Sequence, residues 1–172
     1  MLTDDAYVYG GEPEANTGSV PWLYVGKGSG LQSVITYLRF DLSSITEGKE
    51  ILWATLKMKV GAILESNERR PSSQLLTLVN QAADDNLTEG RLTYRTQPGY
   101  LTDVLNMSQA EATVYAGEWL TWDVTLFVQS KYATSGFVSL VVQMDYLTIR
   151  STRLEFYSKE SEFAPVLEVI YS

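Results

Sequence analysis

The chain has 172 residues, with 13 lysines and arginines against 21 aspartates and glutamates, and a formal net charge of −8 at pH 7. This acidic balance argues against nonspecific binding to nucleic acid or to an anionic membrane surface. Cysteine and histidine are both absent from the sequence. Disulfide frameworks, thiolate metal sites and nucleophiles activated by histidine are therefore excluded.

The length and composition favour one globular domain spanning residues 1–172. A chain of this size buries roughly 70% of the surface that its unfolded state exposes, so it needs no covalent staples. No apolar run approaches the roughly 20 residues required to cross a bilayer, so we expect no membrane insertion. Eleven tyrosines and four tryptophans suit sheets and stacking surfaces.

Alternating apolar and polar residues predict strands along most of the chain. The predicted strands cover residues 5–9, 22–25, 35–42, 51–60, 74–80, 93–98, 137–144, 153–158 and 166–171. Residues 113–116 and 118–122 predict a hairpin about Gly117. Polar loops rich in glycine, proline and asparagine separate most of these segments.

The periodicity becomes helical only once, after Asp123, which is placed as an N-cap. Phe127 and Val128 then share a helical face and Gly136 follows, so we predict a short helix over residues 124–133. Short strands separated by turn signals favour an all-β fold, a two-sheet antiparallel β-sandwich of jelly-roll type. An up-and-down barrel is the alternative fold.

The segment from Tyr37 to Leu42 alternates strictly, with Leu38 and Phe40 on one side and Tyr37 and Arg39 on the other. This pattern predicts a half-buried strand whose open side carries Tyr37 and Arg39. Lys57 and Lys59 likewise share one side of the strand predicted over residues 51–60. A combined patch would suit carboxylated sugars, because cations bind carboxylates and aromatic rings stack on pyranoses. Alternatively, these residues form only the solvated outer face of a sandwich.

The tryptophans allow two interpretations. Trp22, Tyr24 and Trp53 can form a stacking platform or pack in the core, whereas packing is favoured for Trp119 and Trp122.

Several motifs, in a fixed order, cover nearly the whole chain. They are DAYV at 5–8, NTG at 16–18, LYVGK at 23–27, YLRFDLS at 37–43, ATLKM at 54–58, LTYRTQP at 92–98, WDVT at 122–125, FYSKE at 156–160 and PVLEV at 165–169. Together they resemble the extracellular domains called DNRLRE-type, which overlap carbohydrate-binding module family 96.

The resemblance implies a secreted or cell-surface jelly-roll module, appended to polysaccharide lyases, glycoside hydrolases or large surface proteins. Members that bind sugars favour acidic polysaccharides such as alginate and use lysine and arginine. Lys27, Arg39 and Lys159 stand in matching stretches, so the resemblance implies a sugar-binding role for them. The full set of expected carbohydrate-binding residues is Lys27, Arg39, Lys57, Lys59, Lys159, Tyr24 and Tyr37.

The alternative function is that of a structural or adhesive domain in a cell-surface or filament protein. Relatives often carry basic residues just before the YLRF motif, whereas this chain has Val34, Ile35 and Thr36. That departure favours the alternative.

Jelly-roll sugar modules often hold a structural calcium ion, and no other cofactor is expected. Hard oxygen ligands are offered here by Asp5 and Glu12, with Asp4, Glu14 and Asn16 nearby, although no EF-hand spacing occurs.

Catalysis is not expected. Without histidine, the remaining routes are a carboxylate pair or Tyr37 as base beside Arg39, and an exposed strand offers no cleft to position substrate.

Overall fold

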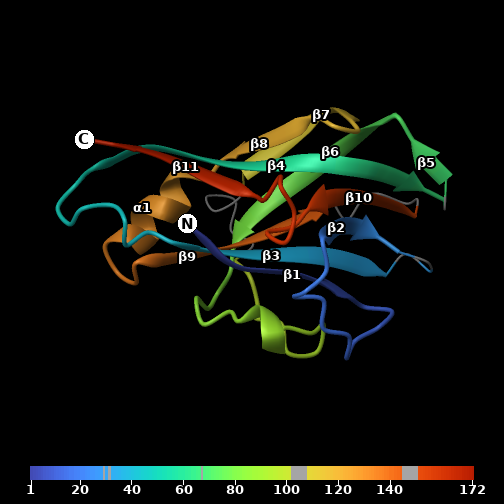
Figure 1. Cartoon of the computed structure of the whole chain (residues 1–172), viewed down its shortest axis with the longest axis horizontal. Helices are drawn as coiled ribbons and strands as arrows, with labels where there is room; N and C mark the ends of the chain where they lie inside the picture. Colours follow the sequence, from blue (N-terminus) through green and yellow to red (C-terminus); the bar gives the residue numbers. More distant parts are fainter. Residues whose placement is uncertain (29, 31, 67, 102–107, 145–150) are drawn as a thin grey trace.

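Figure 1 shows the computed structural model, which describes residues 1–28, 30, 32–66, 68–101, 108–144 and 151–172. The strands are β1 (Leu2–Tyr9), β2 (Trp22–Lys27), β3 (Ser33–Asp41), β4 (Ile51–Glu65), β5 (Glu68–Arg70), β6 (Ser72–Gln81), β7 (Ser108–Tyr115), β8 (Trp119–Asp123), β9 (Phe137–Met144), β10 (Thr152–Tyr157) and β11 (Val166–Tyr171). The helices are the 3₁₀ turn η2 (Glu89–Arg91) and α1 (Thr125–Tyr132).

The long strand β4 belongs to both layers of the fold. Its first part pairs with β11 and β8, so that Leu56 lies between Leu167 and Trp122. Its last part pairs with β10, and the register shifts between Glu155 and Phe156, which leaves Gly61 as an extra residue. Such a bulge bends a strand and increases its twist. The bend lets β4 continue from one layer into the other.

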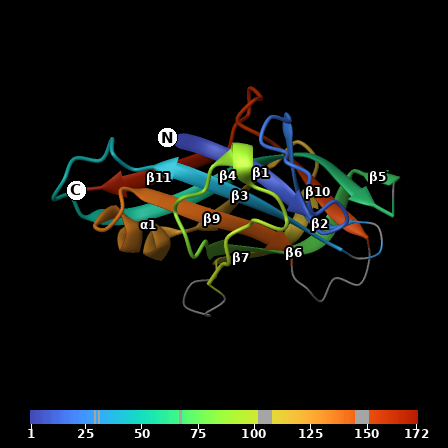
Figure 2. The same ribbon diagram turned by 90° about the horizontal axis from the view of Figure 1, so that it is seen from below.

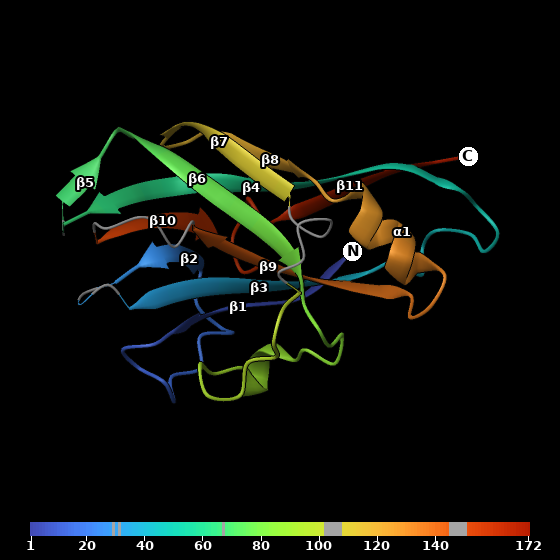
Figure 3. The same cartoon turned by 180° about the vertical axis from the view of Figure 1, so that it is seen from behind.

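The remaining strands form the second layer, from which β6 and β7 lead back to the first layer. The hydrogen-bonded order is β11-β4-β10-β2-β3-β9-β6-β7, with β1 paired to β3 and with β5 and β8 paired to β4. Figure 3 shows β6 running from β7 in the upper layer to β9 in the lower one. Every pairing in the described chain is antiparallel, which confirms the predicted all-β sandwich.

Two hydrophobic cores stabilise the fold. The larger core lies between the layers and includes the fully buried side chains of Leu38, Phe40 and Trp122. A second core lies on the outer side of β1, β3 and β9, where Tyr37 packs with Leu92. Residues 82–101 cover that side, as Figures 1 and 2 show. The lower layer is therefore buried on both faces at β3.

Two predicted strand features are wrong. Residues 93–98 form no strand but a turn over residues 94–96, where Thr93 and Thr96 bond to each other through side-chain and backbone groups. The predicted hairpin about Gly117 is wrong as well: a tight connection joins β7 to β8, but β7 pairs with β6, whereas β8 pairs with β4. Gly117 makes that tight connection with a positive φ of 89°.

The predicted short helix is confirmed as α1. Asp123 accepts a hydrogen bond through Oδ1 from the backbone N–H of Thr125 at 2.9 Å, although Val124 occupies the N-cap position itself. Within the described residues, no helix has the length and hydropathy needed to cross a membrane.

Substitutions at Tyr37 test how much the second core stabilises the fold. The Tyr37→Ala variant is expected to lower the free energy of unfolding by roughly 3–5 kcal/mol, because the cavity would open between β3 and residues 82–101. Tyr37→Phe is expected to cost about 1 kcal/mol through the lost hydroxyl hydrogen bonds. Urea unfolding followed by tryptophan fluorescence measures both. Tyr171→Ala is the control, since Tyr171 is exposed on β11; equal effects of the two alanine variants would contradict the second core.

Candidate functional site

A row of aromatic rings lies on the outer side of the sandwich where β2 and β10 pair. Trp22 on β2 is the partner of Tyr157 on β10, and their ring centroids are 4.8 Å apart. Tyr157 also contacts Phe163, in the connection to β11, at 5.0 Å. All three side chains are only partly buried. The three rings thus form a continuous surface that solvent reaches.

Lys59 lies at one end of this row. Its Nζ atom is 3.2 Å from the ring centroid of Phe163 and 5.9 Å from that of Tyr157. On the other side of Lys59, Trp119 of β8 is its cross-strand partner and is 43% exposed. We call these five residues, Trp22, Lys59, Trp119, Tyr157 and Phe163, the aromatic strip.

The alternation of side chains along β10 and the glycine at position 61 determine where the aromatic strip lies. In β10, Leu154 and Phe156 point into the larger core, so Tyr157 points outward. The bulge residue Gly61 leaves room for the Trp22 ring, because a Cβ atom there would lie 3.0 Å from Trp22 Cζ3. The bulge that bends β4 therefore also accommodates a ring of the strip.

The same face continues along β4 beyond Lys59. Lys57 lies on this face, but its Nζ atom forms an ion pair with Glu168 Oε2 at 2.6 Å. Trp53 is 50% exposed, and its Nε1 donates a hydrogen bond to Thr55 Oγ1. The predicted common side of Lys57 and Lys59 is confirmed, whereas the charge of Lys57 is already compensated.

Tyr24 is half-buried beside the aromatic strip rather than open. Its hydroxyl donates to Glu155 Oε2 at 2.8 Å, and its ring makes an edge contact with Tyr7 at 5.1 Å between centroids. Burial, together with the Glu155 hydrogen bond, raises the pKa of Tyr24 to about 12. The guanidinium of Arg153 lies 5.5 Å from the ring centroid. Tyr24 is thus a neutral hydrogen-bond donor, and its ring already contacts Tyr7 and Arg153.

The predicted role of Tyr37 as a stacking residue is wrong, because residues 82–101 bury its side chain completely. Its hydroxyl donates to Gln97 Oε1 and the Pro98 carbonyl, and burial raises its pKa. Arg39 is also engaged: Nη1 forms an ion pair with Asp4 Oδ2 at 3.2 Å, and the guanidinium lies 3.9 Å from the centroid of the Phe137 ring. Only 20% of the Arg39 side chain is exposed.

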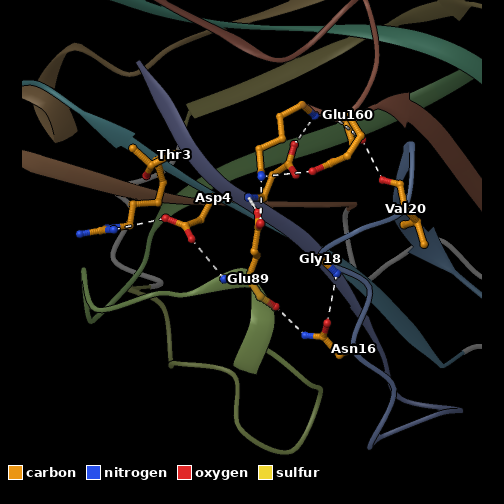
Figure 4. Close-up of polar contacts among 11 residues, drawn as sticks. Thr3, Asp4, Asn16, Gly18, Val20, Glu89 and Glu160 are labelled. Carbon is orange, nitrogen blue, oxygen red and sulfur yellow. Dashed lines mark hydrogen bonds and ion pairs between the residues drawn. The ribbon is translucent and has the colours of Figure 1, made fainter.

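Lys159 faces a cluster of acids instead of open solvent. Its Nζ atom contacts Glu89 Oε1 at 2.8 Å and Glu160 Oε1 at 3.1 Å, and the hydrogen bond to Glu89 raises the pKa of Lys159. The nearby Asp5 is 1% exposed, and burial raises the pKa of its carboxyl group to about 7. Figure 4 shows Glu89 and Glu160 in this network. Glu12, the other expected metal ligand, lies exposed in the loop after β1.

Lys27 ends β2 and is partly buried. Its backbone carbonyl accepts a hydrogen bond from Ser151 Oγ at 3.4 Å. The structure therefore does not gather the seven expected sugar-binding residues at one place.

Several residues of the site were not among those expected. Tyr157 and Phe163 were not singled out, although the alternation of residues 154–157 could have placed Tyr157 on the outer side. Trp119 was expected to pack but is exposed, whereas Trp122 is buried as expected. Glu89 and Glu160 carry no sequence signal that would pair them with Asp5.

Comparisons with solved structures show only distant similarity. A candidate glycoside hydrolase from Bacteroides vulgatus ATCC 8482 has 13% identity and a TM-score of 0.28, over 99% of this chain and 77% of that protein. A second candidate glycoside hydrolase, from Bacteroides thetaiotaomicron VPI-5482, has 12% identity and a TM-score of 0.25, over 96% of this chain and 63% of that protein. Among curated proteins, no sequence matches the chain.

The family comparison is decisive. The model of carbohydrate-binding module family 96 matches residues 1–171. This match agrees with the expectation of a noncatalytic module, and the two solved structures carry no argument for an enzyme. The chain belongs to carbohydrate-binding module family 96 and is a noncatalytic carbohydrate-binding module.

Proposed function

We propose that the aromatic strip binds an acidic polysaccharide of the alginate class, outside the cell, and so holds an appended enzyme on that glycan. The observation that carries this proposal is the position of the Lys59 ammonium group, next to Phe163 and beside Trp119. Within the part of the chain that the structure describes, no carboxylate forms an ion pair with Lys59.

The strip offers two complementary kinds of contact. The faces of Trp22, Tyr157 and Phe163 can pack against the apolar C–H faces of pyranose rings. The Lys59 ammonium group supplies a point charge for a uronate carboxylate. Because the rings form a row rather than a closed pocket, several successive sugars of one chain can contact the strip.

Three of the other expected cations are less suited to a glycan carboxylate. Arg39, Lys57 and Lys159 each pair with an internal carboxylate, from Asp4, Glu168 and Glu89 respectively. A glycan carboxylate would have to replace that partner, and exchanging one ion pair for another gains little free energy. Among the described residues, Lys59 has no such carboxylate partner to lose.

Binding by the module would act on an appended enzyme through proximity. A flexible link to a surface-bound module raises the effective concentration of its partner domain near the same glycan. The resemblance to secreted and cell-surface proteins supports an extracellular setting for this role.

Affinity electrophoresis in native gels containing alginate, pectin or neutral β-glucan tests the site. We expect alginate to retard the wild-type chain, and Lys59→Ala or Trp22→Ala to weaken that retardation about five- to thirtyfold, as the loss of about 1–2 kcal/mol requires. Lys49→Ala and Tyr171→Ala are matched controls, because both residues are exposed and lie outside the strip.

Two results would count against the proposal. Undiminished retardation of Lys59→Ala, together with its loss in Arg39→Ala, would move the site to the position that the family resemblance implies. Unaltered mobility of the wild-type chain in every gel, with oligomers that grow with concentration in sedimentation, would favour the structural or adhesive alternative.

Salt dependence tests the acidic class of the glycan separately. Because exposed charges are screened within about 10 Å at 0.1 M salt, retardation by alginate is expected to fall as sodium chloride rises from about 0.02 to 0.5 M. In the Lys59→Gln variant, which keeps the side chain polar but removes its charge, the residual binding should vary much less with salt. Equal salt slopes for the two proteins would contradict a charge contact at Lys59.

A further inference from the structure

Three carboxylates from distant parts of the chain converge at β1. Asp5 lies in β1, Glu89 begins η2 and Glu160 follows β10. One oxygen from each lies within 4.8 Å of the others. Figure 4 shows Glu89 and Glu160 on either side of the network that joins these segments.

One carboxylate oxygen of this cluster is buried and has no hydrogen-bond partner among the residues that the structure describes. Asp5 is 1% exposed, and its Oδ2 accepts a hydrogen bond from the Lys159 backbone N–H at 2.7 Å. Its Oδ1 is buried as well, but no hydrogen bond from the described part of the chain reaches it. An unpaired carboxylate oxygen in the interior is costly, and an ion is one of the few groups that can satisfy it.

The charges of the cluster do not balance. Three carboxylates face a single ammonium group, that of Lys159, which contacts Glu89 Oε1 and Glu160 Oε1. The adjacent Asp4 adds no free charge, because Arg39 pairs with it. The ionised cluster therefore has an excess negative charge that a divalent cation can neutralise.

Neighbouring hydrogen bonds hold the carboxylates in place. Ser158 Oγ donates to Glu160 Oε2 at 2.9 Å, and the Asp5 N–H donates to Glu89 Oε2 at 3.3 Å. The backbone of Glu89 is held by Asp4 Oδ1 and Asn16 Nδ2. Ligands oriented in this way bind a cation with less reorganisation.

We propose that Asp5, Glu89 and Glu160 bind one divalent cation of the calcium type, in competition with the ammonium group of Lys159. The ligand chemistry selects the ion. All three side chains offer hard oxygen atoms, whereas zinc prefers nitrogen and sulfur ligands. Calcium accepts irregular sets of carboxylates, whereas magnesium requires nearly octahedral geometry and keeps its water. The site is distinct from the aromatic strip and does not depend on the proposed glycan.

Isothermal titration calorimetry and thermal unfolding of the whole chain, without glycan and after treatment with chelator, test the proposal. We expect Ca²⁺ to bind one site and, at about 100 times its Kd, to raise Tm by roughly 5 °C or more. Mg²⁺ at the same concentration is expected to raise Tm less.

Two kinds of variant with opposite expected effects make the test specific. Asp5→Asn or Glu89→Gln should weaken Ca²⁺ binding at least tenfold, because each removes a charged ligand. Lys159→Met should strengthen Ca²⁺ binding, because the competing ammonium group is gone. Glu14→Gln is the matched control, since Glu14 is exposed and pairs only with Arg95 among the described residues.

The proposal is overturned if Ca²⁺ at millimolar concentration binds neither the wild-type chain nor Lys159→Met. It is also overturned if the folded variants Asp5→Asn and Glu89→Gln bind Ca²⁺ as tightly as the wild type. Either result would make Lys159 the only cation of the cluster.

Discussion

The burial of β3 on both of its faces determines which surfaces of this module remain available. Leu38 and Phe40 pack between the layers, whereas Tyr37 packs under residues 82–101. The second core places a phenol in the interior, so Gln97 and Pro98 must accept its hydrogen bond. Arg39, on the same strand, is held by Asp4 and Phe137. A strand built in this way stabilises the fold and leaves little side-chain surface for a ligand.

The opposite situation holds where β4 and β10 meet. Their inner sides contribute Met58, Val60 and Phe156 to the larger core, whereas on their outer side Phe163 covers Lys59 and Tyr157 only in part. Aromatic side chains can remain there because contact with one another, as between Trp22 and Tyr157, shields part of their surface from water. The surface available for stacking is therefore a consequence of which sides the two cores leave open.

The sequence predicted local structure well and the coverage of surfaces poorly. Residues 137–144 and 166–171 form strands with the predicted bounds, and Leu38 and Phe40 are buried as their alternation predicted. Alternation correctly separated Tyr37 from Leu38, but a period of two cannot show that residues 82–101 cover the other side. Alternation likewise placed Lys57 and Lys59 correctly on a common side. It did not predict that Phe163 would lie beside Lys59. The contact of Phe163 with Lys59 depends on how a connection lies against a distant strand, and no local pattern encodes that.

The connection between β10 and β11 links the acidic cluster to the aromatic strip. It carries Glu160, which belongs to the cluster, and Phe163, which belongs to the strip. Short hydrogen bonds stiffen it, since Ser161 Oγ donates to the Ser158 carbonyl at 2.7 Å and accepts from the Phe163 N–H at 3.2 Å. A cation held by Glu160 would therefore fix the segment that places Phe163 beside Lys59. Any effect of such a cation on glycan binding would act through the position of this ring, because the ion and the sugar would contact different residues.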